Sequence, residues 1–274
     1  MVLAQRLIPS ESAGNFAGRL QQTPSPDPVT GLIECHWSKS YTLAVPASWT
    51  SGVYLARLTG ATSGKQSYVI FVVRDDARPS ALLYEASFTT YQAYNFWPGG
   101  SNGKSLYDWA PGKRAWKVSF NRPYVLGYSY VAGQSEGAAS GLGDGEYLTN
   151  LQPGPYSTSY PISPAGFEYN MVRWLEKNGY DVTYAANIDV HENGNLLLNH
   201  NGFISAGHNE YWSMEMRNNV QNALNRGVNL AFFSSNTAYW QIRLEPSAIT
   251  GDADRTIVCY KNQGADPLPR RARA

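Results

Sequence analysis

The sequence predicts an α/β protein in which a mostly parallel β-sheet is flanked by helices and preceded by a small, partial β-sandwich module. Two observations lead to this fold class. From residue 77 onward, short apolar runs alternate with helix-length amphipathic segments, which is the pattern of parallel βαβ units with right-handed crossovers. Before residue 77, apolar runs of period two are separated by Gly, Ser and Pro, which is typical of sandwich strands.

The first 76 residues divide into two parts. Residues 1–33 contain a proline cluster and no sustained hydrophobic period, so we expect a loosely ordered lead-in. Residues 34–76 are expected to form the partial β-sandwich module, with strands predicted at 40–45, 52–58 and 67–73. Because three strands do not make a stable sandwich alone, the module is expected to pack against the following domain.

Residues 77–262 are predicted to form the α/β domain. Its expected strands cover 81–86, 180–184, 202–206 and 228–233, and its expected helices cover 167–177 and 213–227. Ser213 is a suitable N-cap for the second helix, and Gly227 is a suitable residue to end it. An aromatic, glycine-rich insertion at about 88–163 has too little periodicity for a core element. We expect it to fold over the carboxyl edge of the sheet, and we expect residues 263–274 to be a tail.

Composition limits the classes of partner. The formal net charge is +1 and only 16% of the residues are charged, so neither nucleic acid nor an anionic membrane is indicated. The sequence has no apolar stretch of 18 residues and no signal-peptide pattern, which favours a cytoplasmic location. Cys35 and Cys259 lack the spacing of a zinc site or a disulfide framework. A small-molecule substrate is therefore the favoured partner, with a homo-oligomer or a missing partner domain or subunit as further candidates.

Polar and aromatic side chains follow three of the predicted strands, in the segments 91–95, 205–212 and 234–240. Ligands of open α/β sheets bind at the carboxyl ends of strands, so His208, Asn209 and Glu210 are the candidate catalytic residues. The GxSxG, HExxH and P-loop motifs are absent from the sequence. His191 and His200 flank a turn-like segment and are predicted to be surface residues rather than ligands.

Five motifs together resemble the C-terminal part of the N,N-dimethylformamidase large (beta) subunit family. They are 51–57 (SGVYLAR), 91–95 (YQAYN), 119–124 (SFNRPY), 207–212 (GHNEYW) and 234–237 (SSNT). The resemblance implies a class I glutamine amidotransferase-like α/β fold. It also implies hydrolysis of an amide at a mononuclear ferric ion held by two tyrosines and a glutamate.

Carried over by motif position, the resemblance implies Glu210 as the carboxylate ligand of Fe(III) and Tyr94 and Tyr124 as the two phenol ligands. Tyr91, Tyr107 and Tyr128 lie close by in the sequence and remain alternatives. A phenol has a pKa of about 10, so two phenols bind a metal at neutral pH only when the ion is acidic enough to displace their protons. This favours a trivalent ion over Mg²⁺ or Ca²⁺, although another metal ion remains an alternative.

The sequence therefore predicts a metal-dependent hydrolase of a small amide or a related carbonyl compound. In this hypothesis, water activated by the metal attacks a polarised carbonyl, and His208 or Asn209 moves a proton or holds the oxyanion. A lactone or ester hydrolase on the same scaffold is one alternative. A non-catalytic binding or assembly module, in which Glu210 only caps the following helix, is the other.

Overall fold

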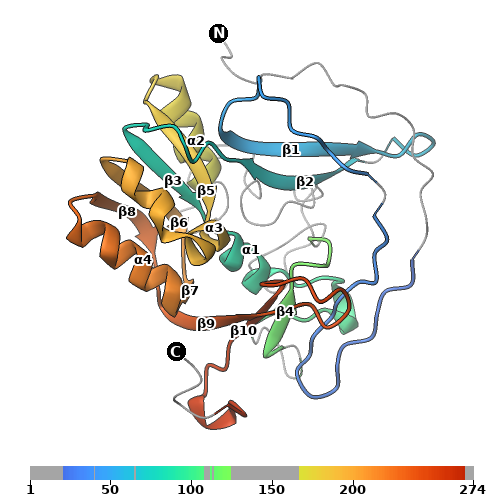
Figure 1. Ribbon diagram of the computed structural model, residues 1–274. Coiled ribbons are helices and arrows are strands. Elements are labelled where there is room, and N and C mark those ends of the chain that lie inside the picture. Colours follow the sequence, from blue (N-terminus) through green and yellow to red (C-terminus); the bar gives the residue numbers. More distant parts are fainter. Residues whose placement is uncertain are drawn as a thin grey trace, which may run out of the picture.

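A computed structural model of the chain describes residues 21–39, 41–64, 66–107, 112, 114–124 and 167–268. Its central feature is a four-stranded sheet with the strand order β5-β3-β6-β8, in which every neighbouring pair is parallel (Figure 1). The strands are β3 (Leu82–Ala86), β5 (Val182–Ala186), β6 (Gly202–His208) and β8 (Asn229–Ser235). The predicted mostly parallel sheet is confirmed, and because all four strands run the same way, their carboxyl ends share one edge.

Helices cover both faces of this sheet (Figure 1). One face packs against α2 (Phe167–Lys177), and the other against α3 (Asn187–Glu192), the 3-10 helix η3 (Gly194–Asn199) and α4 (Met214–Asn225). Consecutive residues of β6 point to opposite faces, so Phe203 joins the α4 side and Ile204 joins the α2 side. A strand buried on both faces is a continuous apolar run, which is why the sequence located β6.

The start and end of α4 follow local sequence signals. The Ser213 hydroxyl accepts a hydrogen bond from the Met216 backbone N–H at 3.1 Å, which satisfies one of the free amides of the first turn. Gly227 follows the helix with φ +94°, a conformation that a residue with a Cβ rarely adopts. Both predicted boundaries of this helix are therefore confirmed.

A second four-stranded sheet, in the order β4-β10-β9-β7, was not predicted. It consists of β4 (Lys117–Ser119), β7 (Tyr211–Ser213), β9 (Trp240–Glu245) and β10 (Thr256–Val258). Three of these strands have only three residues, too few to show a hydrophobic period. β7 follows β6 after a two-residue turn and pairs in parallel with β9, so this sheet continues from the carboxyl edge of the central one.

The amino-terminal module differs from its prediction. β1 (Gly52–Thr59) and β2 (Gln66–Val73) form the expected antiparallel pair. The predicted strand at 40–45 is wrong for residues 41–45, which have no regular secondary structure. Their apolar side chains remain largely exposed, so no buried surface favours an extended pairing there. As expected, the β1–β2 pair packs on the α/β domain, through Val53 and Val72.

The beginning of the insertion also differs from its prediction, because it contains a core helix. In α1 (Phe88–Tyr94) every residue after Phe88 is buried. A helix that is buried all round has no solvent-exposed face to separate polar from apolar residues, so the sequence shows no amphipathic period. The short 3-10 helix η1 (Gly100–Asn102) follows, and residues 125–163 of the insertion lie outside the described part of the chain.

The lead-in is buried where it ends, at Ile33. No helix among the described residues is long and apolar enough to cross a membrane.

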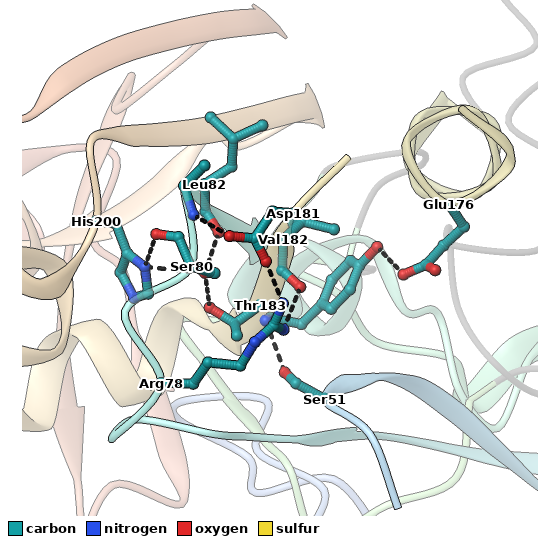
Figure 2. Close-up of polar contacts among 11 residues, drawn as sticks. Ser51, Arg78, Ser80, Leu82, Glu176, Asp181, Val182, Thr183 and His200 are labelled. Atoms are coloured by element: carbon teal, nitrogen blue, oxygen red, sulfur yellow. Dashed lines mark hydrogen bonds and ion pairs between the residues drawn. The ribbon is translucent and has the colours of Figure 1, made fainter. Parts of the chain in front are cut away.

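The prediction that His191 and His200 lie on the surface is wrong for His200 and holds only in part for His191. His200 is only 5% exposed, and its Nδ1 lies 2.9 Å from the Ser80 carbonyl oxygen and 3.0 Å from the Ser80 hydroxyl (Figure 2). The Ser80 hydroxyl also contacts Thr183 Oγ1 at 2.8 Å. His191 is partly buried, with its Nδ1 2.8 Å from the Ser213 hydroxyl. The network in Figure 2 ties the amino ends of β3 and β5 together, at the edge opposite to Glu210, so its role is structural.

Candidate active site

Three oxygen atoms from distant parts of the chain meet at the carboxyl edge of the central sheet. Tyr94 ends α1, Tyr107 follows η1, and Glu210 lies between β6 and β7. The Tyr94 hydroxyl donates to Glu210 Oε2 at 2.7 Å, and the Tyr107 hydroxyl donates to the same oxygen at 2.5 Å. The two hydroxyl oxygens are 2.6 Å apart. We call Tyr94, Tyr107 and Glu210 the phenol–carboxylate cluster.

The backbone of Glu210 is held from two sides. Its N–H donates to the Thr90 hydroxyl at 3.0 Å, and its carbonyl oxygen accepts from the Trp240 N–H at 2.9 Å. Gly207, at the end of β6, has φ +77°, which allows the chain to turn sharply there. The N-cap of α4 is Ser213, so Glu210 does not cap that helix and its carboxylate faces the two phenols instead.

Burial sets the protonation of the cluster. Burial raises the pKa of Tyr94, and the nearby Tyr107 and Glu210 raise it further. Burial also raises the pKa of Tyr107, as does the hydrogen bond to Glu210. Both phenols therefore keep their protons at neutral pH and donate them to the carboxylate, unless a cation displaces them.

His208 is half-buried beside the cluster. Its ring centroid lies 6.1 Å from that of Tyr94. Burial lowers the pKa of His208, and the charge of Glu210 opposes this effect only in part. The imidazole is therefore mainly neutral at pH 7, which is the form that can accept a proton.

Asn209 is fully buried and points away from the cluster. Its Nδ2 donates to Glu85 Oε1 at 2.5 Å and to the Ser205 hydroxyl at 2.8 Å. Its Oδ1 accepts from the Trp212 indole N–H at 2.7 Å. The amide group is thus fully used inside the protein, where it holds the turn between β6 and β7.

The hydrogen bonds to the Glu210 carboxylate come from Tyr94 and Tyr107, whereas the choice made from motif position was Tyr94 and Tyr124. Tyr124 packs against Ile70 and Tyr91, and the Tyr91 hydroxyl donates to Glu168. Tyr107 is the alternative that the structure brings to Glu210. In the sequence only its proximity to Tyr94 marked it, and Tyr128 lies outside the described residues.

Arg122 is a buried residue of the SFNRPY motif that the sequence reasoning missed. Its side chain is 2% exposed. It donates to the Gln92 side chain at 3.2 Å and to the carbonyl oxygens of Gln92 (3.0 Å), Asn95 (2.9 Å) and Lys104 (3.0 Å). Burial lowers the pKa of Arg122 to about 9, so it remains charged at neutral pH. Arg122 joins the carboxyl end of α1, which carries Tyr94, to the segment that leads to Tyr107.

Lys261 places a positive charge against the cluster. Its Nζ lies 3.6 Å from the centroid of the Tyr107 ring, 4.8 Å from that of Trp240 and 5.4 Å from that of Tyr211. These are cation–π distances, and the ring of Tyr107 carries one of the three cluster oxygens. No local motif marks Lys261, because the three rings come from separate elements.

The phenol–carboxylate cluster is a candidate site for a trivalent metal. No group of three or more His, Cys, Asp and Glu side chains in the described part of the chain is arranged to hold a metal ion. The cluster instead offers two phenols and a carboxylate, whose hydroxyl and carboxylate oxygens already meet within hydrogen-bonding distance. Oxygen donors of this kind suit hard, highly charged ions, so the residues fit a ferric ion.

Fold and site together define an α/β protein with a buried phenol–carboxylate cluster at the carboxyl edge of its parallel sheet. The chain belongs to the family described as N,N-dimethylformamidase beta subunit-like, C-terminal, whose model matches residues 4–274. It is 24% identical over 228 residues to the N,N-dimethylformamidase beta subunit of Paracoccus aminophilus. That match covers 78% of this chain and 29% of the relative, so the chain corresponds to under a third of that protein's length.

Proposed function

We propose that this protein is a metal-dependent hydrolase of a small amide, in which Tyr94, Tyr107 and Glu210 hold Fe(III). The observation that carries the proposal is the meeting of two phenol oxygens at one carboxylate oxygen, Glu210 Oε2. Family membership supports the amide as substrate class, since the relative is named as a formamidase subunit. A class I glutamine amidotransferase-like arrangement of the sheet belongs to the same proposal.

Charge balance supports the choice of ion. When both phenols lose their protons, two phenolates and the Glu210 carboxylate carry three negative charges, which a trivalent ion neutralises. Lys261, stacked on the Tyr107 ring, favours the phenolate form of that residue. When bound, the ion would supply Lewis-acid polarisation of the substrate carbonyl.

The side chains around the cluster provide the proton transfers. His208 is mainly neutral and half-buried, so it accepts a proton from the attacking water and later returns it to the leaving amine. Asn209 is engaged with Glu85, Ser205 and Trp212, so its part in this proposal is to hold the turn rather than to bind the oxyanion.

The test is metal content and turnover in four single variants. Protein purified without chelators is expected to contain iron, to absorb visible light through phenolate-to-iron charge transfer, and to hydrolyse N,N-dimethylformamide or another small formamide. Glu210→Gln, Tyr94→Phe and Tyr107→Phe should lose iron and turnover together, because each removes a charge or an oxygen donor while preserving the side-chain shape.

Tyr124→Phe is the matched control, since it also removes one phenol oxygen and the Tyr124 ring packs against Ile70 and Tyr91. It should keep both iron and turnover. Loss of iron in Tyr124→Phe with retention in Tyr107→Phe would show that Tyr124, and not Tyr107, is the second phenol ligand.

Lactones and esters belong in the same substrate panel. Protein that is free of metal and inactive on every substrate would favour the non-catalytic binding module instead.

A further inference from the structure

A second buried carboxyl group lies behind the cluster, at the carboxyl end of β3. Glu85 is 0% exposed. Its Oε1 accepts a hydrogen bond from Asn209 Nδ2, and its Oε2 has no hydrogen-bond partner among the described residues. Glu85 is therefore a fully buried carboxyl group with one neutral hydrogen-bond donor.

The groups that face Glu85 from neighbouring elements are acidic or neutral. Asp189 of α3 acts on it through its charge. Glu168 of α2 is near enough for the charge of Glu85 to raise the pKa of Glu168. β6 contributes the neutral Ser205, and the turn after β6 contributes the neutral Asn209. Asp189 is itself paired with Arg74, at 2.5 Å. No cation thus compensates a negative charge on Glu85 within the described residues.

A carboxyl group in these surroundings stays protonated. Burial raises the pKa of Glu85 to about 8, and the charge of Asp189 adds to this effect, while the hydrogen bond from Asn209 opposes it. In the protonated acid, the carbonyl oxygen still accepts from Asn209 and the O–H occupies the other oxygen. An ionised Glu85 would be an uncompensated buried charge, which proteins avoid by rearranging or admitting water.

Asn209 connects this acid to the candidate active site. It stands between His208 and Glu210 in the chain, and its Oδ1 accepts from the Trp212 indole at 2.7 Å. We propose that Glu85, as a neutral carboxylic acid, is a positioning residue that orients Asn209 and thereby holds the turn presenting His208 and Glu210. The inference rests on the proposed function for its catalytic consequence, although the positioning itself can be measured without turnover.

The Trp212 indole N–H reports directly on Asn209. In protein labelled with ¹⁵N-tryptophan, with Trp212→Phe used to assign the signal, the Trp212 resonance should shift with a midpoint near pH 8 as Glu85 ionises. His208 titrates below its ordinary pKa of 6.5, so its effect is separate. In Glu85→Gln, which keeps the accepting oxygen but cannot ionise, the resonance should stay at its low-pH position throughout.

Glu168→Gln is the matched control, because Glu168 is an equally buried glutamate that contacts Tyr91 and not Asn209. It should preserve the Trp212 titration near pH 8. Iron content or turnover should fall above pH 8 in wild type and persist in Glu85→Gln.

A wild-type Trp212 signal that does not titrate between pH 6.5 and 9.5, or that titrates unchanged in Glu85→Gln, overturns the inference. If the signal behaves as expected while no variant binds iron or turns over, positioning stands and the proposed function fails.

Discussion

Replacing Arg122 by Met is expected to destabilise the protein and loosen the candidate active site at once. The substitution keeps much of the aliphatic stem and removes the guanidinium. The guanidinium makes four hydrogen bonds, with lengths of 2.9 to 3.2 Å, to the carboxyl end of α1 and to Lys104. Its loss leaves three backbone carbonyl oxygens without this donor, and two of these hydrogen bonds are buried.

The magnitude follows from two opposing effects. Each hydrogen bond from a charged donor contributes about 1.5–3 kcal/mol net, and each buried acceptor left unpaired costs about 1–3 kcal/mol. Removing the guanidinium also removes the cost of burying its charge, which is on the order of several kcal/mol. We therefore expect the free energy of unfolding to fall by roughly 3–5 kcal/mol, the amount by which the lost hydrogen bonds exceed the recovered desolvation cost.

The assay is urea denaturation, with iron affinity measured on the same samples. Arg217→Met is the control, because Arg217 is exposed on α4 and its replacement should change stability by no more than about 0.5 kcal/mol. Arg122→Met should also bind iron more weakly than wild type, since Arg122 joins the segments that carry Tyr94 and Tyr107. A loss below about 1 kcal/mol would refute the reasoning, as would unchanged iron affinity.

Three further predictions concern pH and helix capping. The free energy of unfolding should fall as pH rises from 5 to 8. Burial raises the pKa of Glu85 and of Glu168 to about 8, so in this range the folded state binds more protons than the unfolded state. Denaturation at several pH values checks this, and the dependence on pH should be shallower in Glu85→Gln. Turnover should be retained just below pH 6.5 and be lost on further acidification, since His208 must be neutral and its pKa is lowered from 6.5. The pH–rate profile tests this. If a still-active His208→Gln variant retained the loss of activity at low pH, His208 would be excluded as its source. Ser213→Ala should lower the free energy of unfolding by about 1 kcal/mol because it removes the α4 cap. Ser213→Asp should retain most of the wild-type stability, since its carboxylate can accept the same hydrogen bond. Equal stability of the two variants would contradict the capping role.

Several features of the fold could be predicted because their signals are local. The apolar run of β6 and the capped, amphipathic α4 each contain within a dozen residues the information that defines them. The second sheet could not be predicted, because β4, β7 and β10 have three residues each and are stabilised by pairing with distant partners. α1 was missed because burial on every side removes the amphipathic pattern.

The candidate site likewise combines features that local sequence signals predict with contacts between distant residues that they do not. The sequence by itself determined that Glu210 follows a buried strand and precedes a capped helix, which places it at the carboxyl edge of a parallel sheet. Only the tertiary structure decided its partners, because Tyr107 and Tyr94 lie 103 and 116 residues away. The contacts of Arg122, Lys261 and Glu85 were decided at the same level, since hydrogen bonds and cation–π contacts between remote segments leave no periodic trace in a sequence.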